Sequence, residues 1–78
     1  MRNNDRTDEI IGSALKSARL AKDYSLADVA NKLPGISRSS IHKFETGQRS
    51  ISVDNLIRVC KVLEIDYKEL MDDVASKI

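Results

Sequence analysis

Apolar residues recur at helical spacing along this chain in short blocks, and four of the blocks begin with the same arrangement of residues. An apolar residue is followed by Ser or Asp, two further residues, a polar residue and a second apolar residue, at 24–29, 36–41, 51–56 and 65–70. Ser and Asp cap helices by accepting a hydrogen bond from an unpaired backbone N–H. The apolar residue before such a cap packs on an apolar residue in the first turn. The four copies therefore predict four short helices joined by tight connections.

A further helix precedes these four, because Ile11, Leu15 and Ala18 recur on one face. Thr7 or Asp8 is expected to cap it, and signals for strands are nearly absent. The chain has 78 residues, which is enough for one domain, and we place that domain at 8–78 after a flexible arm at 1–7. The pattern predicts an all-α fold with helices near residues 8–22, 26–33, 38–46, 53–63 and 67–76.

The second and third predicted helices are separated by a short turn that contains Pro34 and Gly35. Pro34 ends the second helix, and Gly35 is able to take a left-handed conformation. So short a turn makes the third helix cross the second, which is the geometry that presents a helix to the major groove. Ile41 and Phe44 of the third helix point to the core. Its outward face carries donors suited to bases and phosphates and no acidic residue: Arg38, Ser39, His42, Lys43 and Thr46.

Charge is divided unevenly along the chain, although the formal net charge is only +1. Residues 1–63 carry eleven Lys/Arg and seven Asp/Glu, a net of +4, whereas residues 64–73 carry five acids and one Lys, a net of −4. We therefore expect one face to attract nucleic acid and the C-terminal end to repel it.

Several classes of function are not expected. Cys60 is the only cysteine and no Cys/His cluster is present, so we expect no internal disulfide, no metal and no other cofactor, and a reducing, cytoplasmic setting. No apolar run approaches the roughly 20 residues that span a bilayer, and the N-terminus is too polar for a signal peptide. The chain also lacks an acidic pair with a partner base and a Gly-rich phosphate loop, so we do not expect an enzyme.

The residues on both sides of the predicted turn resemble the phage-repressor and Cro-type, or XRE-like, helix-turn-helix family. The resemblance covers about residues 10–71. It rests on Ile11, Gly12, Leu15, Arg19, Ser25, Ala30, the run Ser37-Arg38-Ser39-Ser40-Ile41, Phe44, Glu45, Gly47, Leu56, Cys60, Leu63, Glu69 and Leu70. It implies a compact five-helix, lambda-repressor-like domain that binds double-stranded DNA and regulates transcription.

The resemblance also implies roles for individual residues. The base-reading positions would be Arg38, Ser39 and Lys43, with His42 as an addition that could equally be an ordinary surface histidine. Phosphate contacts would come from the end of the third helix and the loop after it: Thr46, Gln48, Arg49 and Ser50. Ser25 and the first amides of the second helix would form another phosphate contact. Arg19 and Glu45 match a structural ion pair that ties the first helix to the third.

Three positions depart from the family pattern. Leu26 stands where the second helix usually opens with Gln, so a side-chain contact with DNA is not expected there. The turn at Pro34 and Gly35 is one residue longer than the commonest version. Glu64 replaces the usual Gly at the end of the fourth helix, and a left-handed backbone there would be strained.

The last predicted helix carries an apolar stripe that suggests a dimer. Tyr67, Leu70, Met71, Val74 and Ile78 lie on one helical face. Leu70 and Met71 are needed to close the core, whereas Val74 and Ile78 lie further out, where little of this short chain is left to cover them. We therefore predict a homodimer with an interface at Tyr67, Met71, Val74 and Ile78. The alternative is a frayed tail beyond Met71.

These observations lead to one functional prediction and one alternative. The predicted function is a sequence-specific DNA-binding repressor that binds an inverted-repeat operator as a homodimer. Its biological setting stays open among phage or mobile-element repressors, restriction–modification controllers and antitoxin-like regulators. The alternative is an interaction module of the same fold that binds a regulatory protein partner instead of DNA, which Leu26 and the acidic C-terminal stretch would suit.

Overall fold

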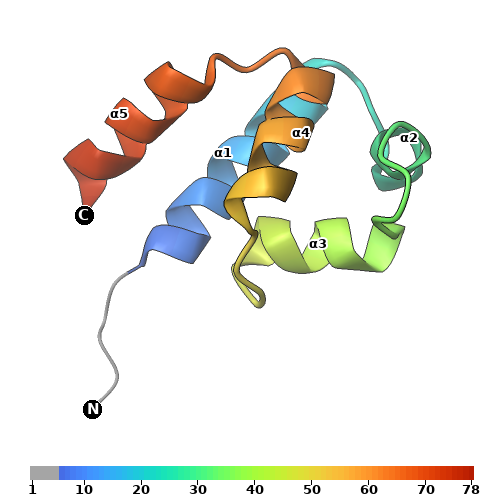
Figure 1. The fold of residues 1–78 in the computed structure, drawn as a ribbon, viewed down its shortest axis with the longest axis horizontal. Helices are drawn as coiled ribbons and strands as arrows, with labels where there is room; N and C mark the ends of the chain where they lie inside the picture. Colours follow the sequence, from blue (N-terminus) through green and yellow to red (C-terminus); the bar gives the residue numbers. More distant parts are fainter. Residues whose placement is uncertain (1–5) are drawn as a thin grey trace.

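The computed structural model describes residues 6–78, which form five α-helices joined by short turns (Figure 1). The helices are α1 (Thr7–Ala21), α2 (Leu26–Asn31), α3 (Arg38–Thr46), α4 (Val53–Leu63) and α5 (Tyr67–Lys77). The predicted all-α fold is confirmed, and every helix boundary lies within two residues of its predicted position. No helix in the described part of the chain is long and apolar enough to cross a membrane.

Four helices begin at the caps that the sequence predicts. Ser25, Ser37 and Ser52 each accept a hydrogen bond from the backbone N–H three residues later. Asp66 accepts from two N–H groups at the start of α5, at 2.9 and 3.1 Å. At Ser25 the capping box is complete, because the carboxylate of Asp28 also accepts from the Ser25 N–H at 2.7 Å. Local residue patterns therefore fix where α2 to α5 begin.

The start of α1 differs from the prediction. The helix already includes Thr7, and its N-cap is Arg6, which makes no side-chain cap hydrogen bond. The predicted cap at Thr7 or Asp8 is therefore wrong, since both residues lie inside the first turn. Asp8 and Glu9 still favour the helix there, because their negative charges face the positive end of the helix dipole. Residues 1–5 of the predicted arm lie outside the described range.

The connection from α2 to α3 is a β-turn of type II. Ile36 donates its N–H to the carbonyl of Leu33 at 3.0 Å, with Pro34 and Gly35 at the two central positions. Gly35 has a φ of +87°, which this turn requires at its third residue. Proline disfavours helical conformation in the residue before it. For that reason α2 ends at Asn31, two residues earlier than predicted.

Helix α1 lies at the centre of the fold and contacts α3, α4 and α5. The closest approach is at Gly12, where a Cβ atom would collide with the backbone carbonyl oxygens of Phe44 and Glu45. The backbones of α1 and α3 therefore touch directly, and a larger residue would push α3 away. The core is formed by Ile11, Leu15, Val29, Leu33, Ile36, Ile41, Phe44, Leu56, Val59, Cys60, Leu63, Leu70 and Val74.

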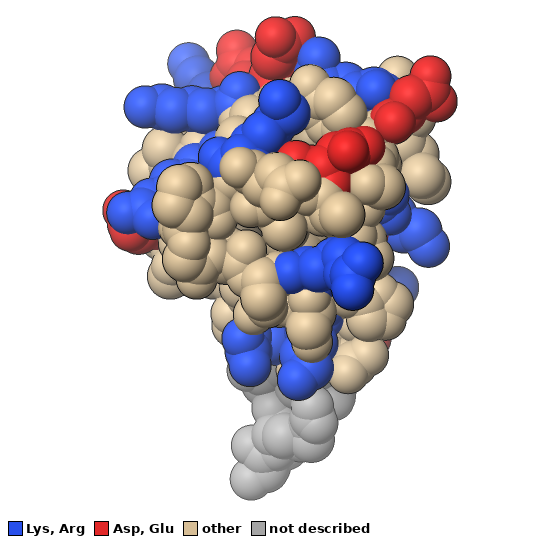
Figure 2. All heavy atoms as spheres, turned by 90° about the vertical axis from the view of Figure 1, so that its right-hand side faces the viewer, with Lys and Arg blue, Asp and Glu red and all other residues tan. Residues whose placement is uncertain are grey.

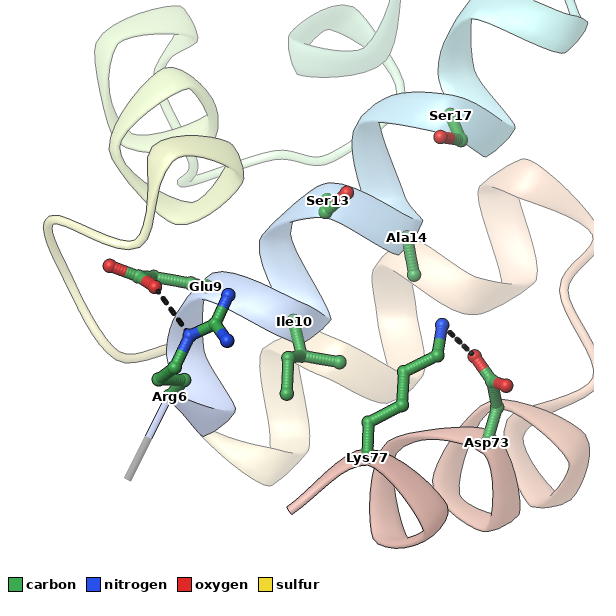
Figure 3. Close-up of a pocket in the computed structure, with 8 residues that line it drawn as sticks. All are labelled: Arg6, Glu9, Ile10, Ser13, Ala14, Ser17, Asp73 and Lys77. Atoms are coloured by element: carbon green, nitrogen blue, oxygen red, sulfur yellow. Dashed lines mark hydrogen bonds and ion pairs between the residues drawn. The ribbon is translucent and has the colours of Figure 1, made fainter. Parts of the chain in front are cut away.

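Helix α5 lies along α1 (Figure 1). Ile10 and Ala14 of α1 line a groove of about 300 Å³ with Asp73 and Lys77 of α5 (Figure 3). Val74 lies in the same turn of α5 and is only 4% exposed, as part of the core. The prediction that a second protomer is needed to cover Val74 is therefore wrong, because the fold of a single protomer already buries it. Ile78 is 65% exposed, as expected.

The end of α4 has the strained conformation that the sequence suggested. Glu64 has a φ of +58° and a ψ of +40°, in the left-handed region. Its carboxylate accepts a hydrogen bond from the Lys22 Nζ at 2.8 Å. This contact lowers the pKa of Glu64 and raises the pKa of Lys22. The ion pair thus links the end of α1 to the end of α4.

Candidate nucleic-acid interface

Helix α3 has one buried side and one exposed side. Ile41 and Phe44 are 4% and 7% exposed and hold the helix on the core. Of the predicted base-reading residues, Arg38, Ser39 and His42 are exposed and Lys43 is half-buried. Among residues 6–78, no side-chain hydrogen bond or ion pair engages these four side chains. Their donors are therefore available to an external partner.

The exposed charges on α3 and the loop after it are all basic. Between residues 37 and 50, Arg38, Lys43 and Arg49 carry positive charge, and the single acid, Glu45, is 8% exposed. Figure 2 looks onto the side where α2 and the start of α3 lie: the charged side chains in its lower part are nearly all Lys and Arg, whereas its upper part carries both basic and acidic side chains. The acid-rich α5 lies on the other side of α1 (Figure 1). The charges exposed around α3 are therefore basic, whereas the acidic residues of α5 lie elsewhere on the fold.

Arg19 and Glu45 lie together inside the fold and orient α3. The Arg19 Nε donates to the Glu45 Oε2 at 2.7 Å, and its Nη2 donates to the Oε1 at 3.1 Å. A third Arg19 donor, Nη1, bonds the carbonyl of Tyr24 at 2.8 Å. The hydrogen bond with Glu45 raises the pKa of Arg19 above its ordinary value. This bidentate pair connects α1, α3 and the turn before α2, so it sets the direction in which α3 faces solvent.

The predicted phosphate contacts after α3 differ in how free their polar groups are. The side chain of Gln48 is exposed, and Arg49 donates only one bond, from Nη1 to the Ser40 Oγ at 3.2 Å. An arginine has five N–H donors, so most of those of Arg49 remain available. Thr46 instead donates its hydroxyl to the carbonyls of its own helix, at 3.1 and 3.3 Å. Ser50 donates to the Asp8 carboxylate at 2.6 Å.

The start of α2 is the least favourable of the predicted phosphate contacts. The Ser25 hydroxyl accepts from the Asp28 N–H at 3.0 Å, and the Asp28 carboxylate accepts from the Ser25 N–H. These backbone and side-chain bonds from Ser25 lower the pKa of Asp28, so its carboxylate is charged. A phosphate at Ser25 would therefore approach a negative charge.

An open groove of about 740 Å³ lies between the first turns of α2 and α3. Sequence reasoning used Leu26 only as support for the protein-binding alternative and gave Ala27 no role, yet both line this groove beside predicted DNA contacts. The signal that could have drawn attention to it was the Leu at position 26. The groove is lined by Arg19, Ser25, Leu26, Ala27, Arg38, Ser39 and His42.

Comparison with known proteins gives the family. Residues 15–70 match the family model described as helix-turn-helix. A putative HTH-type transcriptional regulatory protein of Methanococcoides burtonii is 34% identical over 67 residues, which are 86% of this chain and 20% of that protein. The antitoxin PezA of Streptococcus pneumoniae serotype 4 is 28% identical over 64 residues, 82% of this chain and 40% of PezA. This chain thus spans less than half the length of either relative. It belongs to the Cro/XRE-type helix-turn-helix family of DNA-binding domains.

Proposed function

We propose that this protein is a repressor that binds, as a homodimer, an operator made of two inverted half-sites. The observation that carries the proposal is the exposed side of α3, whose free donors and basic charges are held in one direction by the Arg19–Glu45 pair. The major groove of DNA admits one helix and presents a distinct set of donors and acceptors for each base pair. A rigid helix with free polar side chains is suited to read that set.

The roles of the side chains follow from their chemistry and position. Arg38 pairs with a guanine, because a guanidinium donates two parallel bonds to its O6 and N7. Lys43, Ser39 and His42 lie on the same exposed side and read neighbouring base edges. Gln48 and Arg49 bind backbone phosphates, which fixes the register of the helix without specifying sequence.

Pairing of two copies would place two recognition helices about 34 Å apart, in successive turns of the major groove. Tyr67 and Met71 are partly buried and Ile78 is exposed, so this flank of α5 is accessible although Val74 is not. Val53 and Ile57, one turn apart on α4, are 63% and 37% exposed and were absent from the predicted interface. We propose that dimer contacts come from these exposed apolar residues, since burying them removes apolar surface from water.

Selection of bound duplexes from a random library tests the proposal directly. We expect an enriched palindrome, with half-site centres about 10 base pairs apart, and sedimentation at a dimer mass at micromolar concentration. An Ile57→Glu, Ile78→Glu double variant should sediment as a monomer and bind a half-site only weakly. An enriched single half-site would contradict the dimer. If no duplex is enriched, the fold instead serves to bind a regulatory protein partner.

A further inference from the structure

We propose that Leu26 and Ala27 read the C5-methyl group of a pyrimidine, next to the base pair that Arg38 contacts. The inference rests on the proposed DNA binding and adds a specificity-determining contact that lies outside the recognition helix. The methyl group is carried by thymine and by 5-methylcytosine, so both bases have the chemistry that these two side chains would recognise.

The groove between α2 and α3 has an apolar wall and a polar rim. Leu26 and Ala27 are both half-buried, so each keeps part of its surface exposed, and the rim carries Arg38, Ser39 and His42. Because Arg38 and Ser39 are the first two residues of α3, a base edge that approaches them also approaches Leu26. The apolar wall is therefore part of the surface that would face the major groove.

The position of Leu26 is fixed by its neighbours. Leu26 lies between the two residues of the capping box. The Ser25 N–H donates to the Asp28 carboxylate at 2.7 Å, and the Asp28 N–H donates to the Ser25 hydroxyl at 3.0 Å. One turn later, Val29 is 1% exposed and anchors α2 in the core. The type II turn then fixes α3 relative to α2. Leu26 thus belongs to the same rigid unit as the predicted base-reading residues.

Only one group in the major groove matches an apolar wall. The edges of the bases present nitrogen and oxygen donors and acceptors, and the C5-methyl group of thymine is the exception. Leu26 and Ala27 have no side-chain hydrogen-bonding atom, so contact with any other base edge would leave polar groups desolvated and unpaired. The groove therefore favours a 5-methylpyrimidine at one position of each half-site.

Replacing single thymines of the selected operator by uracil tests this inference, because only the methyl group is removed. At one thymine per half-site we expect wild-type affinity to fall about fourfold, the value for one buried methyl. The Leu26→Gln variant should bind the thymine and uracil duplexes equally. A Leu20→Ala variant is the matched control, since Leu20 is 53% exposed and outside the groove, and it should keep the fourfold difference.

Two further measurements make the result independent of variant stability. Cytosine and 5-methylcytosine placed at the same position distinguish the two sources of the methyl group. If 5-methylcytosine binds about fourfold more tightly than cytosine at this position, the protein recognises the methyl group in either base. If the two bind equally, the protein recognises the methyl group only when thymine carries it. A nuclear Overhauser contact between the Leu26 methyls and the base methyl should accompany wild-type binding.

Three outcomes would overturn the inference. Wild type could bind thymine and uracil duplexes equally at every position, or Leu26→Gln could still bind the thymine duplex more tightly than the uracil duplex. The third outcome is the absence of a nuclear Overhauser contact between the Leu26 methyls and the base methyl. Failure of the proposed function is distinguishable from all three, because the protein would then bind no duplex specifically.

Discussion

Helices α3 and α5 are built by the same local rules and differ in what surrounds them. Each is capped at its N-terminus by a side chain, Ser37 for α3 and Asp66 for α5, and each buries one apolar side. The exposed side of α3 carries free basic donors, whereas that of α5 carries Glu69, Asp72 and Asp73. The sequence predicts both helices equally well. The surface of α3 was easier to predict, because Arg38, Ser39 and His42 point away from the apolar side of the helix and are exposed. The exposure of an apolar residue on α5 depends on how α5 packs on the rest of the fold.

The largest expected effect concerns the support of α3. Glu45→Ala leaves the Arg19 guanidinium buried without its partner, and we expect the free energy of unfolding to fall by about 3–5 kcal/mol. Urea denaturation followed by circular dichroism measures this loss. Arg58→Ala is the control, because the Arg58–Asp54 pair is exposed and its removal should cost under about 0.5 kcal/mol. Equal stability of both variants would show that α3 does not depend on the buried pair.

The second effect separates the two ends of the stripe on α5. Val74→Ala should lower the free energy of unfolding by about 2 kcal/mol, because it opens space in the core. Ile78→Ala should leave the free energy of unfolding of the monomer almost unchanged, since Ile78 is 65% exposed. Denaturation at a concentration below the dimer dissociation constant compares them. A larger loss for Ile78 would mean that the end of α5 packs differently in solution.

The third effect concerns the exposed side of α3 and is expected in binding only. Arg38→Ala should weaken operator binding by about 1–3 kcal/mol and relax specificity at one base pair per half-site. Arg49→Ala should weaken all duplexes alike and reduce the salt slope by about one unit. Neither should lower the melting temperature. Binding titrations at several salt concentrations check both, and a sequence-selective loss in Arg49→Ala would contradict its assignment to phosphate.

The smallest effect is a dependence of stability on pH at the end of α4. The pKa of Glu64 is lowered by Lys22, so the stabilisation from this pair is present above the ordinary carboxyl pKa and is lost as pH falls through the lowered pKa. Glu64→Gly removes the ion pair and also relieves the left-handed strain. We therefore expect its stability relative to wild type to be more favourable at pH 3 than at pH 7. Thermal melts at both pH values measure the difference, and a difference that does not change with pH would exclude a role for the pair.

Features set by neighbouring residues were predictable, and features set by distant ones were not. The caps at Ser25, Ser37, Ser52 and Asp66 depend on groups within three residues, and all four were predicted correctly. The bond from Ser50 to Asp8 joins residues 42 positions apart, and no local pattern encodes it.

Packing between helices set the other limits of prediction. The burial of Val74 depends on how α5 packs on the core, and the groove at Leu26 exists only once α2 and α3 have packed. The exposed side of α3 could be described in advance because its residues make no internal contact that had to be foreseen.

The close approach at Gly12 has a consequence for how this fold can change its target. The backbone carbonyls at the end of α3 lie against the backbone of α1 at Gly12. At this contact, α3 is therefore supported by backbone atoms and not by the identity of its own side chains. In residues 6–78 the side chains of Arg38, Ser39 and His42 form no hydrogen bond or ion pair that stabilises the fold. Exchanging them should therefore alter which operator is chosen at little cost in folding, so that new specificities are accessible through single substitutions on an unchanged scaffold.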